Sequence, residues 1–321
     1  MISDILLVLA GLLILLFAGD VLVRGAVGLA AALKIPALVI SLTIVAFGTS
    51  APELVVTVQA VLADKAGIAL GNIVGSNIAN ILLVLGLPAI IYPVTTHVIG
   101  LRRHGIVMLI ATAAFCAAAY IAGVINTQIG GALFLGVIAY VSYLWIRAMR
   151  SPEREPVLDE VEEYAADSGS FVKTLVFLVA GLIGLPIGAH LLVTHGSTLA
   201  AELGVREELI GLTIIAFGTS LPELATVFAA AIHKKSDVAI GGIIGSNIFN
   251  IFAVGGAAGL AGTAVFSAAS LRFEIPVMII SALLLSFFVF TRRDIGRLTG
   301  IVMFAGYLAF IFYLAKAAGP F

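Results

Sequence analysis

The chain has 321 residues, of which 61% are hydrophobic and 11% charged, and its formal net charge is −1. Soluble domains are nearer half apolar and a quarter charged, so this composition excludes a soluble enzyme, a nucleic-acid-binding protein and a disordered chain. An outer-membrane β-barrel is excluded as well, because its strands alternate in hydrophobicity. At about 20 apolar residues per crossing, the sequence predicts an all-α, polytopic membrane protein embedded in the lipid bilayer.

Ten transmembrane helices are predicted from apolar runs that are bounded by charged residues, proline or glycine. The first run lacks the basic segment that precedes a cleavable signal, so we expect it to be retained as a helix. The predicted helices cover residues 4–31, 37–62, 67–91, 104–124, 128–149, 171–196, 207–232, 238–261, 272–291 and 297–318.

A long polar stretch separates the fifth predicted helix from the sixth, and it is rich in aspartate and glutamate. Such a stretch could attract cations or regulate the protein, but its composition favours a solvated linker between two halves. We therefore expect a first five-helix unit over 1–150, an acidic cytoplasmic linker over 151–170, and a second five-helix unit over 171–321.

Basic residues are shared unequally between the two sides of this topology. The loops on the side opposite the N-terminus carry twelve lysines and arginines, whereas the N-terminal side carries four. Because cytoplasmic loops are enriched in these residues, the basic side is predicted to be cytoplasmic. Both termini are then expected outside the cell membrane, which is the inner or plasma membrane.

Two sequence blocks each occur twice in the chain. The first is LTIVAFGTSAPEL at 42–54, which returns as LTIIAFGTSLPEL at 212–224. The second is IALGNIVGSNIANI at 68–81, which returns as VAIGGIIGSNIFNI at 238–251. Both pairs share one offset of 170 residues, which indicates an internal duplication with motif regions 42–81 and 212–251.

The duplication has a topological consequence. Each half holds five predicted helices, and five is an odd number, so the second half enters the membrane from the opposite side. The sequence therefore predicts two inverted-topology five-helix repeats, an architecture of many secondary transporters. In such proteins the binding site lies near the bilayer midplane, at the interface between the repeats.

Each copy of the first block carries a glutamate directly after a proline, Glu53 after Pro52 and Glu223 after Pro222. A proline within a helix cannot donate a backbone hydrogen bond and crowds the carbonyl four residues earlier. We therefore expect a local break that frees carbonyls toward a cavity. Ionisable groups at membrane depth are costly and usually functional, so the paired glutamates favour a site over two simple proline kinks.

Hydroxyl and amide groups accompany the two carboxylates. Thr49 and Ser50 precede Glu53 by four and three residues and so share its side of the helix. The second block adds serine and asparagine four residues apart, and its glycines Gly71 and Gly75 match a helix-packing motif. The other polar members of the set are Ser76, Asn80, Thr219, Ser220, Ser246 and Asn250.

The predicted set of ligands consists of oxygen atoms alone. Oxygen ligands suit hard cations such as Ca²⁺, Na⁺ and Mg²⁺ and disfavour softer metals. Because Mg²⁺ gives up its water molecules reluctantly, a site built from many protein oxygens favours Ca²⁺ or Na⁺.

The paired motifs GTSAPE with GSNIAN, and GTSLPE with GSNIFN, resemble the two α-repeats of the sodium/calcium exchanger family, within the Ca²⁺/cation antiporter superfamily. The resemblance covers nearly the whole chain and implies a short, prokaryotic-type member. It implies a central Ca²⁺ site formed by the side chains of Glu53 and Glu223 and the carbonyls of Thr49 and Thr219. It also implies flanking Na⁺ sites, with Asn80 and Asn250 lining the middle. The flanking ligands would be Ala46, Ser50 and Ser76 on one side, and Ala216, Ser220 and Ser246 on the other.

The implied function is exchange of Na⁺ for Ca²⁺ by alternating access, in which the first and sixth helices slide across the motif helices. Such a protein is a transporter and not an enzyme, and it needs no cofactor and no protein partner. An H⁺/Ca²⁺ antiporter is the alternative, with the two glutamates taking protons. An intramembrane enzyme is less favoured, because no nucleophile, metal cluster or phosphate-binding site accompanies the carboxylates. A passive channel is less favoured because discontinuous helices in inverted repeats favour occlusion over an open pore.

One position departs from the pattern of the family. Some members, including potassium-dependent ones, carry aspartate where this chain has Asn250. The fixed charge of the core is then at most −2, which weakens the case for K⁺ co-transport.

Four further ionisable residues lie in predicted helices without an assigned role. Asp20 and Arg24 are four residues apart and are expected to pair with each other. His190 aligns with Asp20 at the offset of 170, and His195 lies five residues further on. We expect both histidines to be satisfied interfacial groups, and proton sensing through them is the alternative.

Overall fold

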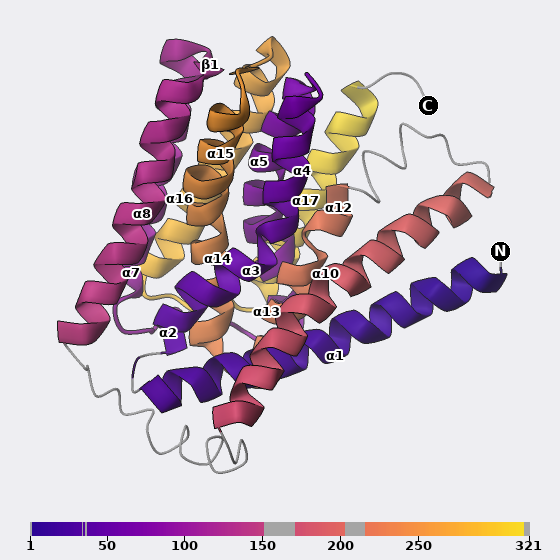
Figure 1. Cartoon of the computed structure of the whole chain (residues 1–321), viewed down its shortest axis with the longest axis vertical. Helices are drawn as coiled ribbons and strands as arrows, with labels where there is room; N and C mark the ends of the chain where they lie inside the picture. Colours follow the sequence, from indigo (N-terminus) through magenta and orange to yellow (C-terminus); the bar gives the residue numbers. More distant parts are fainter. Residues whose placement is uncertain (1, 34, 36, 151–170, 203–215, 318–321) are drawn as a thin grey trace.

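The computed structural model describes residues 2–33, 35, 37–150, 171–202 and 216–317, and these form a bundle of helices (Figure 1). Within these ranges, eight helices are long and apolar enough to cross a membrane, and one bent pair forms a further candidate span. The protein is therefore a multi-pass membrane protein. The acidic linker lies outside the described residues, and the seventh predicted helix is described only from Ala216 on.

Two long helices, α1 (Ile2–Leu33) and α10 (Phe171–Glu202), run side by side and cross the rest of the bundle obliquely (Figure 1). Glycines bring their backbones together. A Cβ atom at Gly11 would lie 2.8 Å from the carbonyl oxygen of Gly188, and one at Gly25 would lie 2.6 Å from the backbone nitrogen of Leu178. These close approaches make α1 and α10 one packed unit, which we call the α1–α10 pair.

The remaining helices of the first half contain short π-helical turns, labelled η. In chain order they are α2 (Ala37–Ile40), η1 (Ser41–Val45), α3 (Ala46–Thr49), α4 (Ala51–Leu62), α5 (Ala66–Ala79), η2 (Asn80–Leu85), α6 (Gly86–Ile91), α7 (Leu101–Ala117), η3 (Ala118–Ala122) and α8 (Thr127–Arg150).

Over its described residues, the second half contains α12 (Ala216–Thr219), α13 (Leu221–Ile232), α14 (Ser236–Phe249), η5 (Asn250–Val254), α15 (Gly255–Ala261), η6 (Ser270–Glu274), α16 (Ile275–Thr291) and α17 (Arg297–Ala317). It repeats the order of the first half as far as α15, but its next π-helical turn, η6, precedes α16, whereas η3 follows α7.

The core of the bundle lies around α5 and α14. Every residue from Val238 to Phe249 is buried, and the π-helical turn that follows is buried as well. Peripheral helices instead expose large apolar side chains, such as Leu135 on α8 and Leu298 on α17. This is the distribution expected when lipid surrounds the bundle, because only groups that contact lipid gain from being apolar and exposed.

Among the described residues, strand-type backbone pairing joins the two halves in two places outside the helices. Strand β1 (Val124–Ile125) pairs with strand β2 (Ala264–Val265) in an antiparallel arrangement. A single antiparallel bridge also links Val94 to Ile295. These backbone contacts fasten connections from one half to connections from the other.

Both predicted helix breaks are present. The backbone leaves the helical geometry at Ser50, with φ −85° and ψ 5°, and at Ser220, with φ −89° and ψ 3°. In the first half the helices before and after the break are inclined by 43°. The proline lies two residues after each break, within the first turn of the next helix, where its missing N–H costs no intrahelical hydrogen bond.

Candidate ion site

Two buried carboxylates lie at the starts of two helices. Glu53 is in the first turn of α4 and Glu223 is in the first turn of α13, and their side chains are 1% and 2% exposed. The N-terminus of a helix carries partial positive charge from its unpaired N–H groups, which favours an anionic side chain there. The proline-induced breaks thus create two helix starts inside the bundle, each with a glutamate on it.

Hydrogen bonds connect the motif regions of the two halves. The hydroxyl of Ser50 donates to Oε1 of Glu223 over 3.3 Å, and Nδ2 of Asn80 donates to Oδ1 of Asn247 over 3.2 Å. The hydroxyls of Thr49 and Ser246 lie 3.4 Å apart. The structure therefore brings the repeated sequence blocks together in one buried region.

The two halves of this region are not equivalent. The counterpart of the Ser50–Glu223 contact would join Ser220 to Glu53, yet within the described part of the chain the Ser220 hydroxyl has no hydrogen-bond partner. Asn250 is fully buried, and neither polar atom of its side chain has a partner there. The hydrogen bonds of Ser50 and Asn80 are therefore formed, whereas over the same described residues the equivalent bonds of Ser220 and Asn250 are not.

Several buried oxygens remain unsatisfied among the described residues. They are Oε2 of Glu53, Oε2 of Glu223, Oδ1 of Asn80, the hydroxyl of Ser220 and Oδ1 of Asn250. A buried polar group without a partner costs about 1–3 kcal/mol. Carboxylate, hydroxyl and amide oxygens in a buried space are ligands for a hard cation such as Ca²⁺ or Na⁺. Over the same residues, no cluster of three or more histidine, cysteine or acidic side chains could hold a metal.

The backbone positions of the predicted set lie at the two ends of the short helices α3 and α12, which precede the breaks. Ala46 is buried at the start of α3, and its carbonyl accepts hydrogen bonds from the Ser50 N–H over 3.1 Å and the Thr49 hydroxyl over 3.4 Å. Ala216 begins α12, and Thr219 ends it. Each of these positions is therefore within one helical turn of a break.

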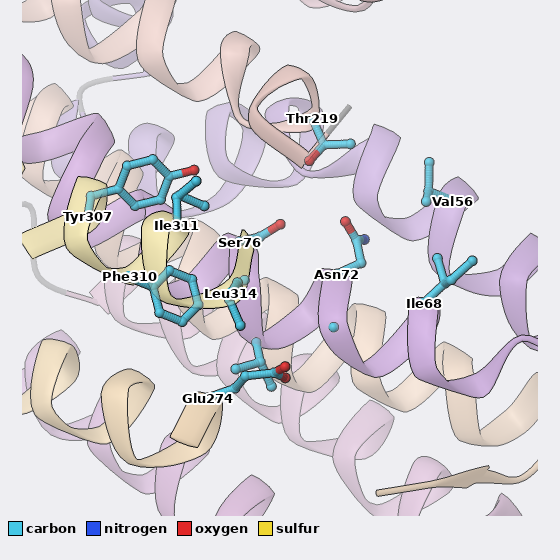
Figure 2. Close-up of a pocket in the computed structure, with 13 residues that line it drawn as sticks. Val56, Ile68, Asn72, Ser76, Thr219, Glu274, Tyr307, Phe310, Ile311 and Leu314 are labelled. Atoms are coloured by element: carbon cyan, nitrogen blue, oxygen red, sulfur yellow. The ribbon is translucent and has the colours of Figure 1, made fainter. Parts of the chain in front are cut away.

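A cavity of about 340 Å³ reaches this region along one face of α5, which it separates from α17. Figure 2 shows Ser76, Asn72 and Thr219 at its polar side, with Tyr307 pointing toward Ser76. The remaining lining residues are largely apolar, except for the carboxylate of Glu274. They are Val56, Ile68, Gly71, Val74, Gly75, Glu274, Phe310, Ile311 and Leu314.

The packing role expected for Gly71 and Gly75 is wrong in this structure. A Cβ atom at either position would meet nothing within 4 Å, because both glycines face the cavity. Their repeat equivalents do pack closely: a Cβ at Gly245 would lie 2.7 Å from that of Ala46. The same motif therefore opens a cavity in one half and closes a helix contact in the other.

Asn72, Thr57 and Asn247 lie near the site but were not among the residues predicted from the sequence. Asn72 donates to the Thr57 hydroxyl over 2.8 Å and to the carbonyl of Glu53 over 3.2 Å, which fastens α5 to α4 beside the carboxylate. Glycine occupies the equivalent of Asn72 in the second half, so comparison of the copies gave no signal. Asn247, which holds Asn80, did have a signal, because its asparagine occurs in both copies.

The four other ionisable residues that the sequence drew attention to lie on the α1–α10 pair. Asp20 pairs with Arg24 at 2.9 Å, as expected, and it also pairs with His233. His195 contacts Asp4 at 3.0 Å within the α1–α10 pair, which confirms the expectation of a satisfied group. His190 is exposed on α10.

Known proteins resemble the chain over almost its whole length. The family described as "Sodium/calcium exchanger protein" matches residues 3–149 and 173–316. The putative antiporter CaxA of Alkalimonas amylolytica is 35% identical over 96% of this chain and 97% of that protein. The sodium/calcium exchanger MaX1 of Methanosarcina acetivorans is 33% identical over 97% of this chain and 98% of that protein.

A solved structure of the sodium–calcium exchanger NCX_Mj has the same fold. It superposes with a TM-score of 0.84 at 32% identity, over 98% of this chain and 99% of that one.

Proposed function

The chain belongs to the sodium/calcium exchanger family, and from this membership we propose that it exchanges Na⁺ for Ca²⁺ across the cell membrane by alternating access. The observation that carries the proposal is the pair of buried carboxylates, Glu53 and Glu223, each with an unsatisfied oxygen. Together they supply a fixed charge of −2, which one Ca²⁺ neutralises.

The central Ca²⁺ site comprises the carboxylates of Glu53 and Glu223 with the backbone carbonyls of Thr49 and Thr219. Flanking Na⁺ sites lie on either side, and Asn80 and Asn250 line the middle. The flanking ligands are Ala46, Ser50 and Ser76 in one group, and Ala216, Ser220 and Ser246 in the other. Burial of the described side chains among these residues and the hydrogen bonds that join the two halves support this assignment.

Sodium is the proposed counter-ion because of the groups that surround the carboxylates. A proton needs only a carboxylate oxygen, whereas Na⁺ needs several oxygen ligands. The hydroxyls of Ser76 and Ser246 and the amide of Asn250 offer such ligands. A protein that carried protons would not need them. Exchange of H⁺ for Ca²⁺ is the second candidate, supported by the same two carboxylates.

Coupling follows from competition for one negatively charged core. Moving uncompensated charge into a low-dielectric passage is expensive, so the empty core resists the change from one facing state to the other. Either one Ca²⁺ or a set of Na⁺ ions offsets the charge and permits that change. Exchange becomes obligatory without a separate coupling device.

The proposed architecture has ten crossings in two inverted repeats, 1–150 and 171–321, joined by the cytoplasmic linker 151–170, with both termini outside. Equivalent breaks at Ser50 and Ser220 and equivalent π-helical turns that begin at Asn80 and Asn250 support the duplication. The distribution of basic residues supports the orientation.

With this proposed topology, we assign the structure to an outward-facing state. The cavity reaches Ser76 and Thr219 from the end of the bundle where α4 ends and α5 begins, which is the proposed outer side. Toward the other side, the Thr49 and Ser246 hydroxyls lie in contact at 3.4 Å.

Uptake of radioactive Ca²⁺ into proteoliposomes tests the function. Vesicles preloaded with Na⁺ should accumulate Ca²⁺, and vesicles without a gradient should not. Uptake that follows a proton gradient and ignores Na⁺ would favour the H⁺/Ca²⁺ antiporter, and rapid Ca²⁺ flux without any counter-ion would exclude antiport.

A further inference from the structure

The α1–α10 pair is docked on the second half of the core through α1. A Cβ atom at Gly19 would lie 2.7 Å from the carbonyl oxygen of Ala225 on α13, so the two backbones are in close contact. The next residue of α1, Asp20, pairs with His233, the residue that follows α13, and with Arg24 at 2.9 Å. An ion pair thus joins the mobile helices of the proposed transporter to its core.

At the repeat offset of 170 residues, this contact has a counterpart in which the acid and the histidine change places. Asp20 corresponds to His190 on α10, so the acid on one long helix is a histidine on the other. His233 corresponds to Ala63, and the adjacent residue is Asp64, so here the core provides the acid. The two potential pairs each contain one aspartate and one histidine, with the positions reversed.

The counterpart contact is open in this structure. Ala225, which α1 covers, is 9% exposed, whereas its equivalent Val55 on α4 is 53% exposed. His190 and Asp64 are both exposed, and neither has an ion pair among the residues that the structure describes. The docking surface for α10 on α4 is present but uncovered.

We propose that Asp20–His233 and His190–Asp64 are alternative ion pairs that hold the α1–α10 pair on α13 in this state and on α4 in the oppositely facing state. The proposal rests on the alternating-access function. In an inverted-repeat transporter each half takes up the arrangement of the other when the facing direction changes. One pair then breaks as the other forms, so the change costs no net ion pair and neither end state is strongly preferred.

Cysteine cross-linking with a short bifunctional methanethiosulfonate tests this in the full-length protein in liposomes, with Cys116 replaced by alanine. One variant carries Asp20→Cys and His233→Cys, and the other carries His190→Cys and Asp64→Cys. The first should cross-link in ion-free buffer. The second should give several-fold more product when Na⁺ or Ca²⁺ is added, because a loaded core permits the change of state.

A matched control carries Asp4→Cys and His195→Cys, which lie in contact inside the α1–α10 pair. Its yield should be the same in every buffer. If this control cross-links and the His190/Asp64 variant never does, the proposal is overturned. Transport by the parent protein is measured separately: exchange without that product removes only the ion-pair proposal, whereas absence of exchange removes the proposed function.

A second measurement uses neutral variants that keep the shape of the side chain. In the Asp20→Asn background, docking on α13 is weakened, so the His190/Asp64 product in Na⁺ buffer should increase several-fold. Asp4→Asn, on the same helix, is the matched control and should leave the yield unchanged. Equal yields in the Asp20→Asn and Asp4→Asn backgrounds would overturn the proposal.

Discussion

Ser50 donates a hydrogen bond of 3.3 Å to Glu223 across the boundary between the two halves, while the equivalent serine, Ser220, makes no such bond to Glu53. Two nearly identical sequence segments therefore have different partners in one structure. The difference distinguishes the two sides of the proposed site.

Glu53→Gln and Glu223→Gln should each abolish Ca²⁺ transport, because either change removes half of the fixed charge while keeping the shape of the side chain. Ca²⁺ uptake into proteoliposomes measures the effect. Glu202→Gln, an exposed glutamate at the end of α10, is the control and should transport normally. Normal uptake by either buried variant would contradict the central-site assignment.

Ser76→Ala and Ser246→Ala should each raise the Na⁺ concentration needed for half-maximal exchange by roughly tenfold, since contacts to charged groups are worth about 1.5–3 kcal/mol. Ser281→Ala is a matched control, because Ser281 is equally buried but bonds to the carbonyl of Val277 within α16. Titration of Na⁺-dependent Ca²⁺ release measures the shift. An unchanged Na⁺ requirement in both variants would remove these serines from the Na⁺ sites.

Gly75→Leu should slow ion entry from the side of the cavity without loss of stability. A Cβ atom at Gly75 would meet nothing within 4 Å, and replacing a helical glycine gains up to about 1 kcal/mol. Gly67→Leu is the control: it also meets nothing, but it does not line the cavity. Slower exchange in the Gly75 variant alone, at an unlowered melting temperature, is expected. Equal exchange rates would show that the cavity is not an ion path.

Exchange of three Na⁺ for one Ca²⁺ would move one net charge per cycle, worth about 2.3 kcal/mol per 100 mV. Transport should then respond to a potassium potential set with valinomycin. A rate that is independent of voltage would indicate an electroneutral stoichiometry.

The sequence was sufficient to predict the helical membrane fold and the family, because apolar runs and a duplicated motif are local patterns. It also led to the pair of buried glutamates, since each copy supports the other. It could not predict that Gly71 and Gly75 face a cavity while Gly245 packs against Ala46. The same motif in both halves predicts the same surroundings for its glycines. The pairing of Asp20 with His233 was missed for another reason: it depends on how α1 crosses α13, which no local pattern contains.

The contact between β1 and β2 has a consequence for biogenesis. Val124 leaves the ribosome long before its partner, Val265, so the first half enters the membrane with an unpaired strand edge. The segment from α2 to α3, which packs against the buried helix α14 in the finished core, likewise lacks this partner at that stage. The nascent first half therefore cannot complete the core by itself, and the core forms fully only after the helices of the second half have been inserted.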